Sequence, residues 1–443
     1  MDIDKTPAPG EVVAIRNNDD DHIEKMGPMS VAIPELNAEE RALDKKILRK
    51  IDLLILPFLT IRRVETYILL GVANISWGIM TIMLLFSKGF ALPATLRVFI
   101  GAAEGLTQIN NVFLTMWYNQ HEIATRTGIW YSSGVLAGSF NGIIAYGIQA
   151  NNTTSLTPWQ LLFLVEGILP IVFGPILIYF YPSSPEKVKK YFSPEEKALC
   201  ITRTQRARNT AGSGITISGM LSIFKSPETY AMWLAYFCVI WTSSGYGNFL
   251  PSIVNGLGFD EAMSQLLTVP ICFLGFLSVN FWCWNSDRFQ LRGPLIIGLA
   301  IVCATGFSIL AGVAQGKGAR MFALCLISFS VQPLIPLTLA FLFTNTVGLS
   351  RRALSIPLQN ACGQFGGLAV SYTFTDGPRY FQGTIATIGC LIALCIIIAG
   401  LDLYFLRQNR HKDALRGSDE WMADREKSFD ELGTKHPEFL FTL

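Results

Sequence analysis

Two charged residues, Arg97 and Glu104, lie inside an apolar stretch, residues 92–114, that is long enough to cross a bilayer as a helix. A charge at the centre of a membrane helix costs at least ~2.5–3.5 kcal/mol, so such residues are rarely kept without a use. Their spacing of seven residues is almost two helical turns, which places both side chains on one face, about 10 Å apart along the axis. Asn111 extends the same polar face. The stripe indicates either a water-filled transport path or a structural salt bridge between helices, and we favour the path.

The two charges suit different steps of transport. Glu104 lies near the middle of its segment, where a carboxylate is neutral unless a cation is close, so its protonation depends on its neighbours. This dependence predicts a proton carrier, and the alternative is a permanent ion pair with Arg97 or with another helix. Arg97 keeps its charge and can hold a carboxylate through two parallel hydrogen bonds, which predicts an anion-binding residue. A structural pair with Glu166, in a later apolar segment, explains Arg97 equally well.

Further polar side chains inside apolar segments could line the same path. Amides and aromatic rings suit a small planar organic anion, although each such group alone more often holds helices together. The predicted substrate-binding residues besides Arg97 are Asn111, Tyr131, Trp241, Asn248 and Asn360. The sequence shows neither a nucleophile with its base, nor a metal-binding set, nor a phosphate-binding loop. We therefore expect no enzyme, no ATP-driven pump, no cofactor and no metal.

The composition indicates a polytopic all-α membrane protein. The chain has 443 residues, of which 51% are hydrophobic and 15% are charged, where soluble proteins carry about 25% charged residues. The mean hydropathy is +0.39. A net charge of +2 gives no electrostatic footprint for nucleic acid, so the expected partners are the lipid bilayer, protons and a small organic anion. We expect a monomer.

About ten full membrane spans are predicted, because each apolar stretch has the 20–25 residues that cross the hydrocarbon core. The predicted spans are 66–86, 92–114, 127–149, 159–181, 231–253, 264–284, 294–314, 321–345, 353–374 and 383–406. A shorter apolar run before them, from Asp52 to Ile61, is too short to cross and stops at Arg62 and Arg63. It resembles the beginning of a span that ends early.

The charges of the loops predict the orientation. Lysine and arginine concentrate in the loops that are cytoplasmic if the N-terminus is cytoplasmic, above all in residues 182–230. Asn151 and Asn152 begin two overlapping glycosylation signals in a predicted outer loop, which predicts a glycoprotein. The predicted parts are a cytoplasmic tail (1–50), a truncated first span with a basic loop (51–65), a bundle of four spans (66–181), a cytoplasmic central loop (182–230), a bundle of six spans (231–406) and a mostly disordered cytoplasmic tail (407–443).

Several motifs occur in a fixed order along these segments. They are the run of residues 50–57; Arg97, Gly101 and Glu104 followed by Trp117, Tyr118, Glu122, Arg126 and residues 128–131; Trp159, Phe163, Glu166, Gly167, Pro182 and Pro185; Asp287 and Arg288 with Arg292 and Gly293; and Arg351, Arg352, Asn360, Gly366 and Gly367. In this order the chain resembles the major facilitator superfamily, specifically the fungal allantoate-permease branch of its anion:cation symporter family. The resemblance implies a two-bundle fold in which twelve spans are usual.

The sequence departs from this family at one place. Thr60 is followed at once by Ile61, Arg62 and Arg63, which resemble the end of a basic loop that precedes the third span in the family. Most of span one and all of span two are absent, including an Asp-Arg pair that the family carries late in span one. The gap is either a real deletion or an exon missing from the gene model, and we favour the missing exon. A real deletion would favour a transport-inactive protein that binds a ligand or partner without moving it.

The resemblance implies a secondary active transporter in the plasma membrane. It implies proton coupling through Glu104 and a small organic anion, such as a carboxylate vitamin or a ureide, as substrate. Asp287 and Arg288 follow a span directly, where an acid and a base can bridge neighbouring helix ends and hold one gate closed. With Glu166 they form the set of residues for which we predict a gating or structural role.

Overall fold

The fold is seen in a computed structural model of the chain. The structure describes residues 64–107, 121–150, 156–180, 217–313, 316–375, 380–425 and 432–443, with the isolated positions 48, 114, 118, 196 and 377. Within these residues the regular elements are all helical, as the predicted all-α class requires. Each predicted span corresponds to one long helix: α2 (Val64–Met83), α3 (Ala91–Thr107), α5 (Ile123–Ala150), α6 (Pro158–Phe180), α9 (Pro227–Asn255), α10 (Glu261–Phe289), α11 (Gly293–Gly312), α12 (Lys317–Asn345), α13 (Leu349–Ser371) and α14 (Phe381–Ala414).

The helices differ in how apolar they are. Five of those described, α6, α10, α11, α12 and α14, are long and apolar enough to cross a bilayer. Others carry polar residues inside the expected span; α13, for example, contains Gln359 and Asn360, which are both buried. A membrane helix keeps such residues when they face protein rather than lipid, because the amides then find partners or neighbours away from hydrocarbon.

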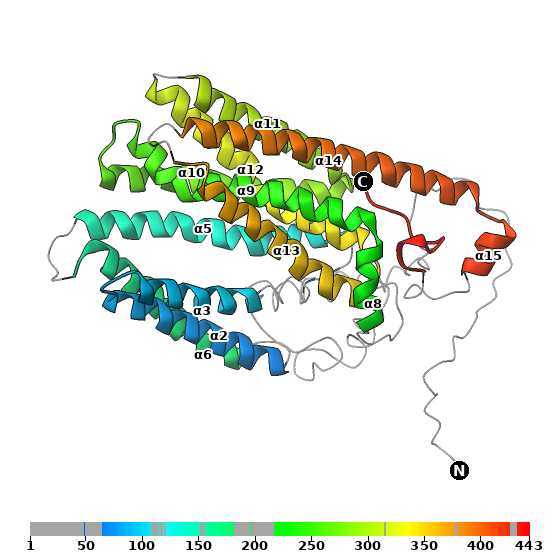
Figure 1. The fold of residues 1–443 in the computed structure, drawn as a ribbon, viewed down its shortest axis with the longest axis horizontal. Coiled ribbons are helices and arrows are strands. Elements are labelled where there is room, and N and C mark those ends of the chain that lie inside the picture. The colour runs from blue at the N-terminus through cyan, green and yellow to red at the C-terminus, as the bar shows by residue number, and fades with distance from the viewer. Residues whose placement is uncertain are drawn as a thin grey trace, which may run out of the picture.

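The helices form two groups. Figure 1 shows α2, α3 and α6 on one side of α5, and most of the later helices, α9 to α14, on the other side. The first group packs around a small cluster of Leu84, Leu96 and Ile100. The second group holds the main core, where residues such as Ile271, Leu334 and Leu394 are fully buried.

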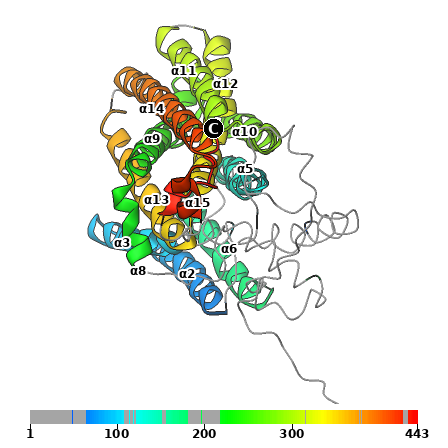
Figure 2. The same ribbon diagram turned by 90° about the vertical axis from the view of Figure 1, so that its right-hand side faces the viewer.

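Helix α5, which precedes α6 in the chain and is counted here with the first group, lies at the boundary with the second group and packs chiefly along α10, as the end-on view in Figure 2 also shows. The two helices approach closely at Gly128, where a Cβ atom would lie 2.6 Å from the Sγ atom of Cys283. Only a glycine fits this contact, because that distance is shorter than carbon and sulfur atoms tolerate. The contact joins the two halves of the chain near one end of α10.

The C-terminal residues differ from the sequence prediction. Helix α14 continues beyond the predicted end of its span at residue 406, and a short helix, α15 (Asp419–Arg425), follows it. Residues 432–443 then fold back onto the long helices, where Phe439 and Phe441 are buried. The expectation of a mostly disordered tail is therefore wrong for this segment, because its two aromatic side chains reach the apolar core. Residues 1–47, 49–63 and 426–431, which include the predicted truncated span, lie outside the described residues.

Candidate functional site

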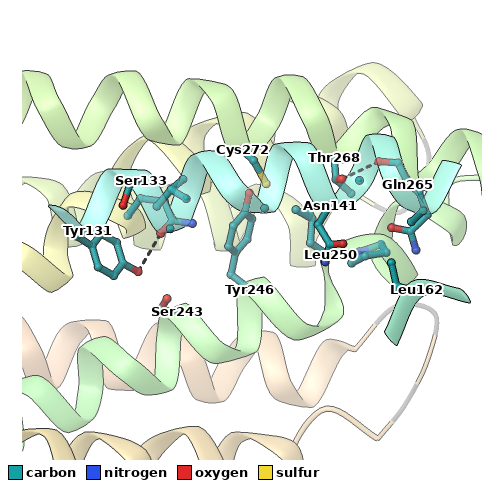
Figure 3. Close-up of a pocket in the computed structure, with 18 of the residues that line it drawn as sticks. Tyr131, Ser133, Asn141, Leu162, Ser243, Tyr246, Leu250, Gln265, Thr268 and Cys272 are labelled. Atoms are coloured by element: carbon teal, nitrogen blue, oxygen red, sulfur yellow. Dashed lines mark hydrogen bonds between the residues drawn. The ribbon is translucent and has the colours of Figure 1, made fainter. Parts of the chain in front are cut away.

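A cavity of about 690 Å³ lies where α5 and α6 face α9, α10 and α12. Figure 3 shows side chains from these helices converging on it. Such a cavity is large enough for a small organic molecule. Its polar lining consists of Trp130, Tyr131, Ser133, Asn141, Ser243, Tyr246, Gln265, Thr268 and Gln332.

One wall of the cavity is fixed by hydrogen bonds between its lining residues. The hydroxyl of Tyr131 on α5 donates to Oε1 of Gln332 on α12 at 3.3 Å, and Ser243 of α9 lies beside the same hydroxyl (Figure 3). On α10, the hydroxyl of Thr268 donates to the backbone oxygen of Gln265 at 2.7 Å. The Tyr131 contact joins the two groups of helices across the cavity.

Tyr246 on α9 brings a buried hydroxyl to the wall of the cavity. Its side chain is almost fully buried and projects toward Cys272 (Figure 3). Ser328 is a polar neighbour of the Tyr246 hydroxyl, but the hydroxyl makes no hydrogen bond of ordinary geometry to a described residue. A buried hydroxyl without a full partner is costly, so a substrate that supplies one would bind more tightly.

The described lining of the cavity contains no charged side chain. It offers ring faces from Trp130, Tyr131 and Tyr246, and amide groups from Asn141 and Gln332. Ring faces stack on planar molecules, and amides both donate and accept hydrogen bonds. The cavity is therefore suited to a planar molecule with polar substituents.

The predicted substrate-binding residues are not gathered in one place. Tyr131 lines the cavity. Trp241 lies beside α13 and stacks at a tilt on Phe237, with 6.1 Å between the ring centres. Asn248 is exposed on α9, Asn360 is buried in α13, and neither belongs to the cavity lining. Asn111, like the predicted glycosylation sites Asn151 and Asn152, lies outside the described residues. Asn141, Tyr246 and Gln332 also line the cavity, and the sequence signal for each of them is a polar group inside an apolar span.

Arg97 and Glu104 lie on α3, which packs against α2 and does not line the cavity. Both are exposed within the described part of the chain, and their charges interact with each other. Glu166 is half-buried on α6, and no described ion pair joins it to Arg97. Of the two partners considered for Arg97 within the protein, the structure brings Glu104 into electrostatic reach.

Asp287 joins the two groups of helices at one end of the molecule, called here the Asp287 end. It lies in the last turn of α10, and its Oδ2 atom accepts a hydrogen bond from the backbone N–H of Thr125 at 2.6 Å. Its Oδ1 atom accepts one from the N–H of Ala124 at 3.1 Å. These N–H groups belong to the first turn of α5, where the helix has no partners of its own and carries partial positive charge. A carboxylate from α10 thus caps a helix of the other half of the chain.

The basic partner of Asp287 is Arg292. The guanidinium of Arg292 is fully buried and lies 3.3 Å from Oδ1 of Asp287. Burial lowers the pKa of Arg292, and the charge of Asp287 opposes this shift. Arg288, the neighbour that the sequence suggested as the gating partner, is exposed and lies over the ring of Trp284 at 5.3 Å. Sequence adjacency favoured Arg288, but the turn after α10 directs Arg292 inward.

The chain matches a protein family over most of its length. The family model for the Major Facilitator Superfamily matches residues 56–371. A high-affinity nicotinic acid transporter of Saccharomyces cerevisiae is 27% identical over 382 residues, which is 84% of this chain and 70% of that protein. An uncharacterized transporter of Schizosaccharomyces pombe, C11D3.18C, is 26% identical over 81% of this chain and 72% of its own length.

Solved structures share the fold. The proton:xylose symporter XylE bound to 6-bromo-6-deoxy-D-glucose superposes with a TM-score of 0.60 at 14% identity, over 84% of this chain and 87% of that chain. The human organic anion transporter MFSD10 superposes with a TM-score of 0.53 at 11% identity, over 82% of this chain and 86% of that chain. At such low identities the likeness concerns the fold alone.

Proposed function

Because the chain belongs to the Major Facilitator Superfamily, we propose that it is a proton-coupled transporter that moves a small organic anion by alternating access. The observation that carries the proposal is the cavity between the two helix groups, with the Asp287 contact joining those groups at one end. A cavity at the boundary of two groups, with a breakable contact beyond it, is what rocking of one group against the other requires. Membrane helices and named transporters among the relatives support the broader class of secondary transporter.

The proposed substrate is a planar carboxylate. The cavity offers ring faces and amides rather than charges, which suits the ring and its polar substituents. A relative named as a nicotinic acid transporter supports the same class, and nicotinate is the first compound to test. We assign to Arg97 the attraction of the anion, because it is a permanent cation within a membrane segment.

Glu104 is the proposed proton carrier. It shares α3 with Arg97, and the two charges interact. Whether Glu104 is protonated therefore depends on whether Arg97 has bound substrate. A negatively charged substrate that reaches Arg97 would weaken this interaction and favour proton uptake by Glu104. Substrate and proton would then cross together.

The proposed orientation places the Asp287 end in the cytoplasm and the protein in the plasma membrane. Positive charge in the loops supports the orientation. We also propose that most of span one and all of span two are absent between Thr60 and Ile61, within residues outside the described part of the structure.

Uptake of radiolabelled nicotinate into cells that express the chain tests the proposal. We expect uptake that rises when the outside is more acidic, and Glu104→Gln should abolish the dependence on the pH gradient. Uptake by the wild type that ignores both the gradient and this substitution would contradict proton coupling. Sequencing of the transcript across codons 60 and 61 decides whether the missing spans are a real deletion or an exon left out of the gene model. A chain extended by any recovered exon is tested in parallel.

A further inference from the structure

The segment Gly433–Leu443, called here the C-terminal strap, lies across the Asp287 end of the second helix group (Figure 2, red). His436, Phe439 and Phe441 of the strap are buried, with 2%, 3% and 7% of their surfaces exposed. The ring of Phe441 stacks on Phe405 of α14 with 4.4 Å between the ring centres. The strap is thus packed as core rather than as a surface tail.

Two asparagine side chains bind the backbone of the strap. Asn345, the last residue of α12, accepts from the N–H of Thr442 at 2.8 Å and donates to the carbonyl of the same residue at 3.0 Å. Asn409 of α14 makes the same pair of bonds with Phe441, both at 2.9 Å. A side-chain amide that satisfies both backbone groups of one residue fixes the register of an extended segment.

Lys412 of α14 binds backbone carbonyls in the curved first part of the strap. Its ammonium donates to the carbonyls of Thr434, His436 and Phe439 at 2.6, 3.1 and 2.8 Å. The chain turns at Gly433, whose φ of +59° suits glycine, and a Cβ atom there would overlap the guanidinium of Arg351. Three carbonyls around one amino group hold the strap in a single conformation.

The strap is connected to the contact between the two helix groups. The carbonyl of its last residue, Leu443, accepts a hydrogen bond from the N–H of Arg292 at 2.6 Å. The guanidinium of the same Arg292 binds Asp287, and Asp287 caps α5 through Thr125. A continuous series of hydrogen bonds therefore runs from the strap to the first turn of α5.

We infer that the C-terminal strap is a latch, which holds Arg292 in the position that lets Asp287 cap α5 and so keeps the Asp287 end closed. The strap touches α9 through Glu228, α12 through Asn345 and α14 through Asn409, so it also fixes the ends of these helices relative to one another. Its release would break the hydrogen bond to the backbone N–H of Arg292 and so weaken the cap. The inference rests on the proposed alternating access, in which this end must open once in each cycle.

A native cysteine reports whether this end is open. Cys283 lies one turn before Asp287, is fully buried, and packs against Gly128 of α5. Separation of α5 from α10 would expose its thiol to a small maleimide. Cys303, which is also fully buried but lies on α11 within the second helix group, is the internal control. Labelling of each site is followed by mass spectrometry of its peptide, in the full-length protein without substrate.

Phe441→Ala and Asn409→Ala are the test variants, and Lys435→Ala, an exposed position of the same strap, is the matched control. We expect the labelling rate of Cys283 to rise on the order of tenfold in Asn409→Ala, because the loss of one hydrogen-bonding partner costs about 1.4 kcal/mol, which is a factor of ten. Phe441→Ala, which removes a buried ring, should raise the rate at least as much. Cys303 and the control variant should label at the wild-type rate.

The inference is overturned if hydrogen exchange shows that residues 439–443 are released in a variant while Cys283 still labels at the wild-type rate. If the labelling rate of Cys303 rises as much as that of Cys283, the variant has lost its fold. The milder variant Asn409→Asp then replaces it, because it keeps the side-chain volume and the acceptor oxygen. The inference is overturned if residues 439–443 are released in Asn409→Asp while Cys283 labels at the wild-type rate. These readouts need no transport. A chain that labels as expected but takes up no substrate contradicts the proposed function, and a chain that transports but labels like the wild type in every variant contradicts only the latch.

Discussion

The Oδ2 atom of Asp287 in α10 accepts a hydrogen bond from the backbone N–H of Thr125 in α5, at 2.6 Å. The two residues belong to different halves of the chain, and the bond combines helix capping with a favourable interaction between a carboxylate and the positive end of a helix. Under the proposed alternating access, this bond is present when the Asp287 end is closed and breaks when that end opens. The following predictions concern this contact, the cavity beyond it and the strap.

Asp287→Asn should destabilise the closed state. The substitution removes the negative charge that the buried guanidinium of Arg292 and the first turn of α5 share. We expect a loss of about 1–3 kcal/mol in stability, measured by thermal unfolding in detergent, together with faster labelling of Cys283. Asp260→Asn is the control, because Asp260 caps its own helix α10 at the opposite end and is exposed. Equal losses in the two variants would contradict a special role for Asp287.

Tyr246→Phe should weaken substrate binding without weakening the fold. Tyr246 lines the cavity, and its buried hydroxyl makes no hydrogen bond of ordinary geometry to a described residue, so removing the hydroxyl costs the fold little. We expect KM for nicotinate uptake to rise up to about tenfold, as for loss of one hydrogen bond to a ligand, with an unchanged unfolding temperature. Tyr230→Phe, outside the cavity, should leave KM unchanged. A wild-type KM in Tyr246→Phe would place the substrate elsewhere.

Gly128→Ala should force α5 away from α10. The added Cβ atom would lie 2.6 Å from both Cβ and Sγ of Cys283, so the helices must separate or the variant must lose stability. We expect a cost of about 1–3 kcal/mol, as in other overpacked contacts. Cys283→Gly in the same chain should restore most of the loss by removing both clashing atoms. Gly147→Ala, on the same helix with open space around it, should be neutral or stabilising.

Docking of the C-terminal strap should strengthen as the pH rises from about 8 to 10.5. Burial lowers the pKa of Lys412 from 10.5 to about 8 in the docked state. Within this window the docked form has lost its proton while the released form still holds it, so removing protons favours docking. Below about pH 8 both forms carry the proton, and this group contributes no pH dependence. Hydrogen exchange of residues 439–443, corrected for intrinsic rates, measures the effect, and Lys412→Met should abolish it.

The sequence by itself determined the membrane class and the ten long helices. The thickness of the hydrocarbon core sets how many consecutive apolar residues a spanning helix needs, and that number can be counted along the chain. It also identified Asp287 as a residue at a helix end with a bridging role, and the structure shows which groups it bridges. Of the polar residues selected from the sequence, Tyr131 of the first half lies in the cavity lining, whereas Trp241, Asn248 and Asn360 of the second half do not. Whether any of them binds substrate stays a prediction.

Only the tertiary structure decided which partners these residues meet. Arg292 rather than Arg288 binds Asp287, because the turn after α10 reverses the chain and buries the later arginine. Asn345 and Asn409 bind the backbone of the C-terminal strap, and Phe439 and Phe441 of the strap join the core. These contacts connect residues far apart along the chain. Their energy comes from mutual burial and hydrogen bonding, which neither partner reveals alone.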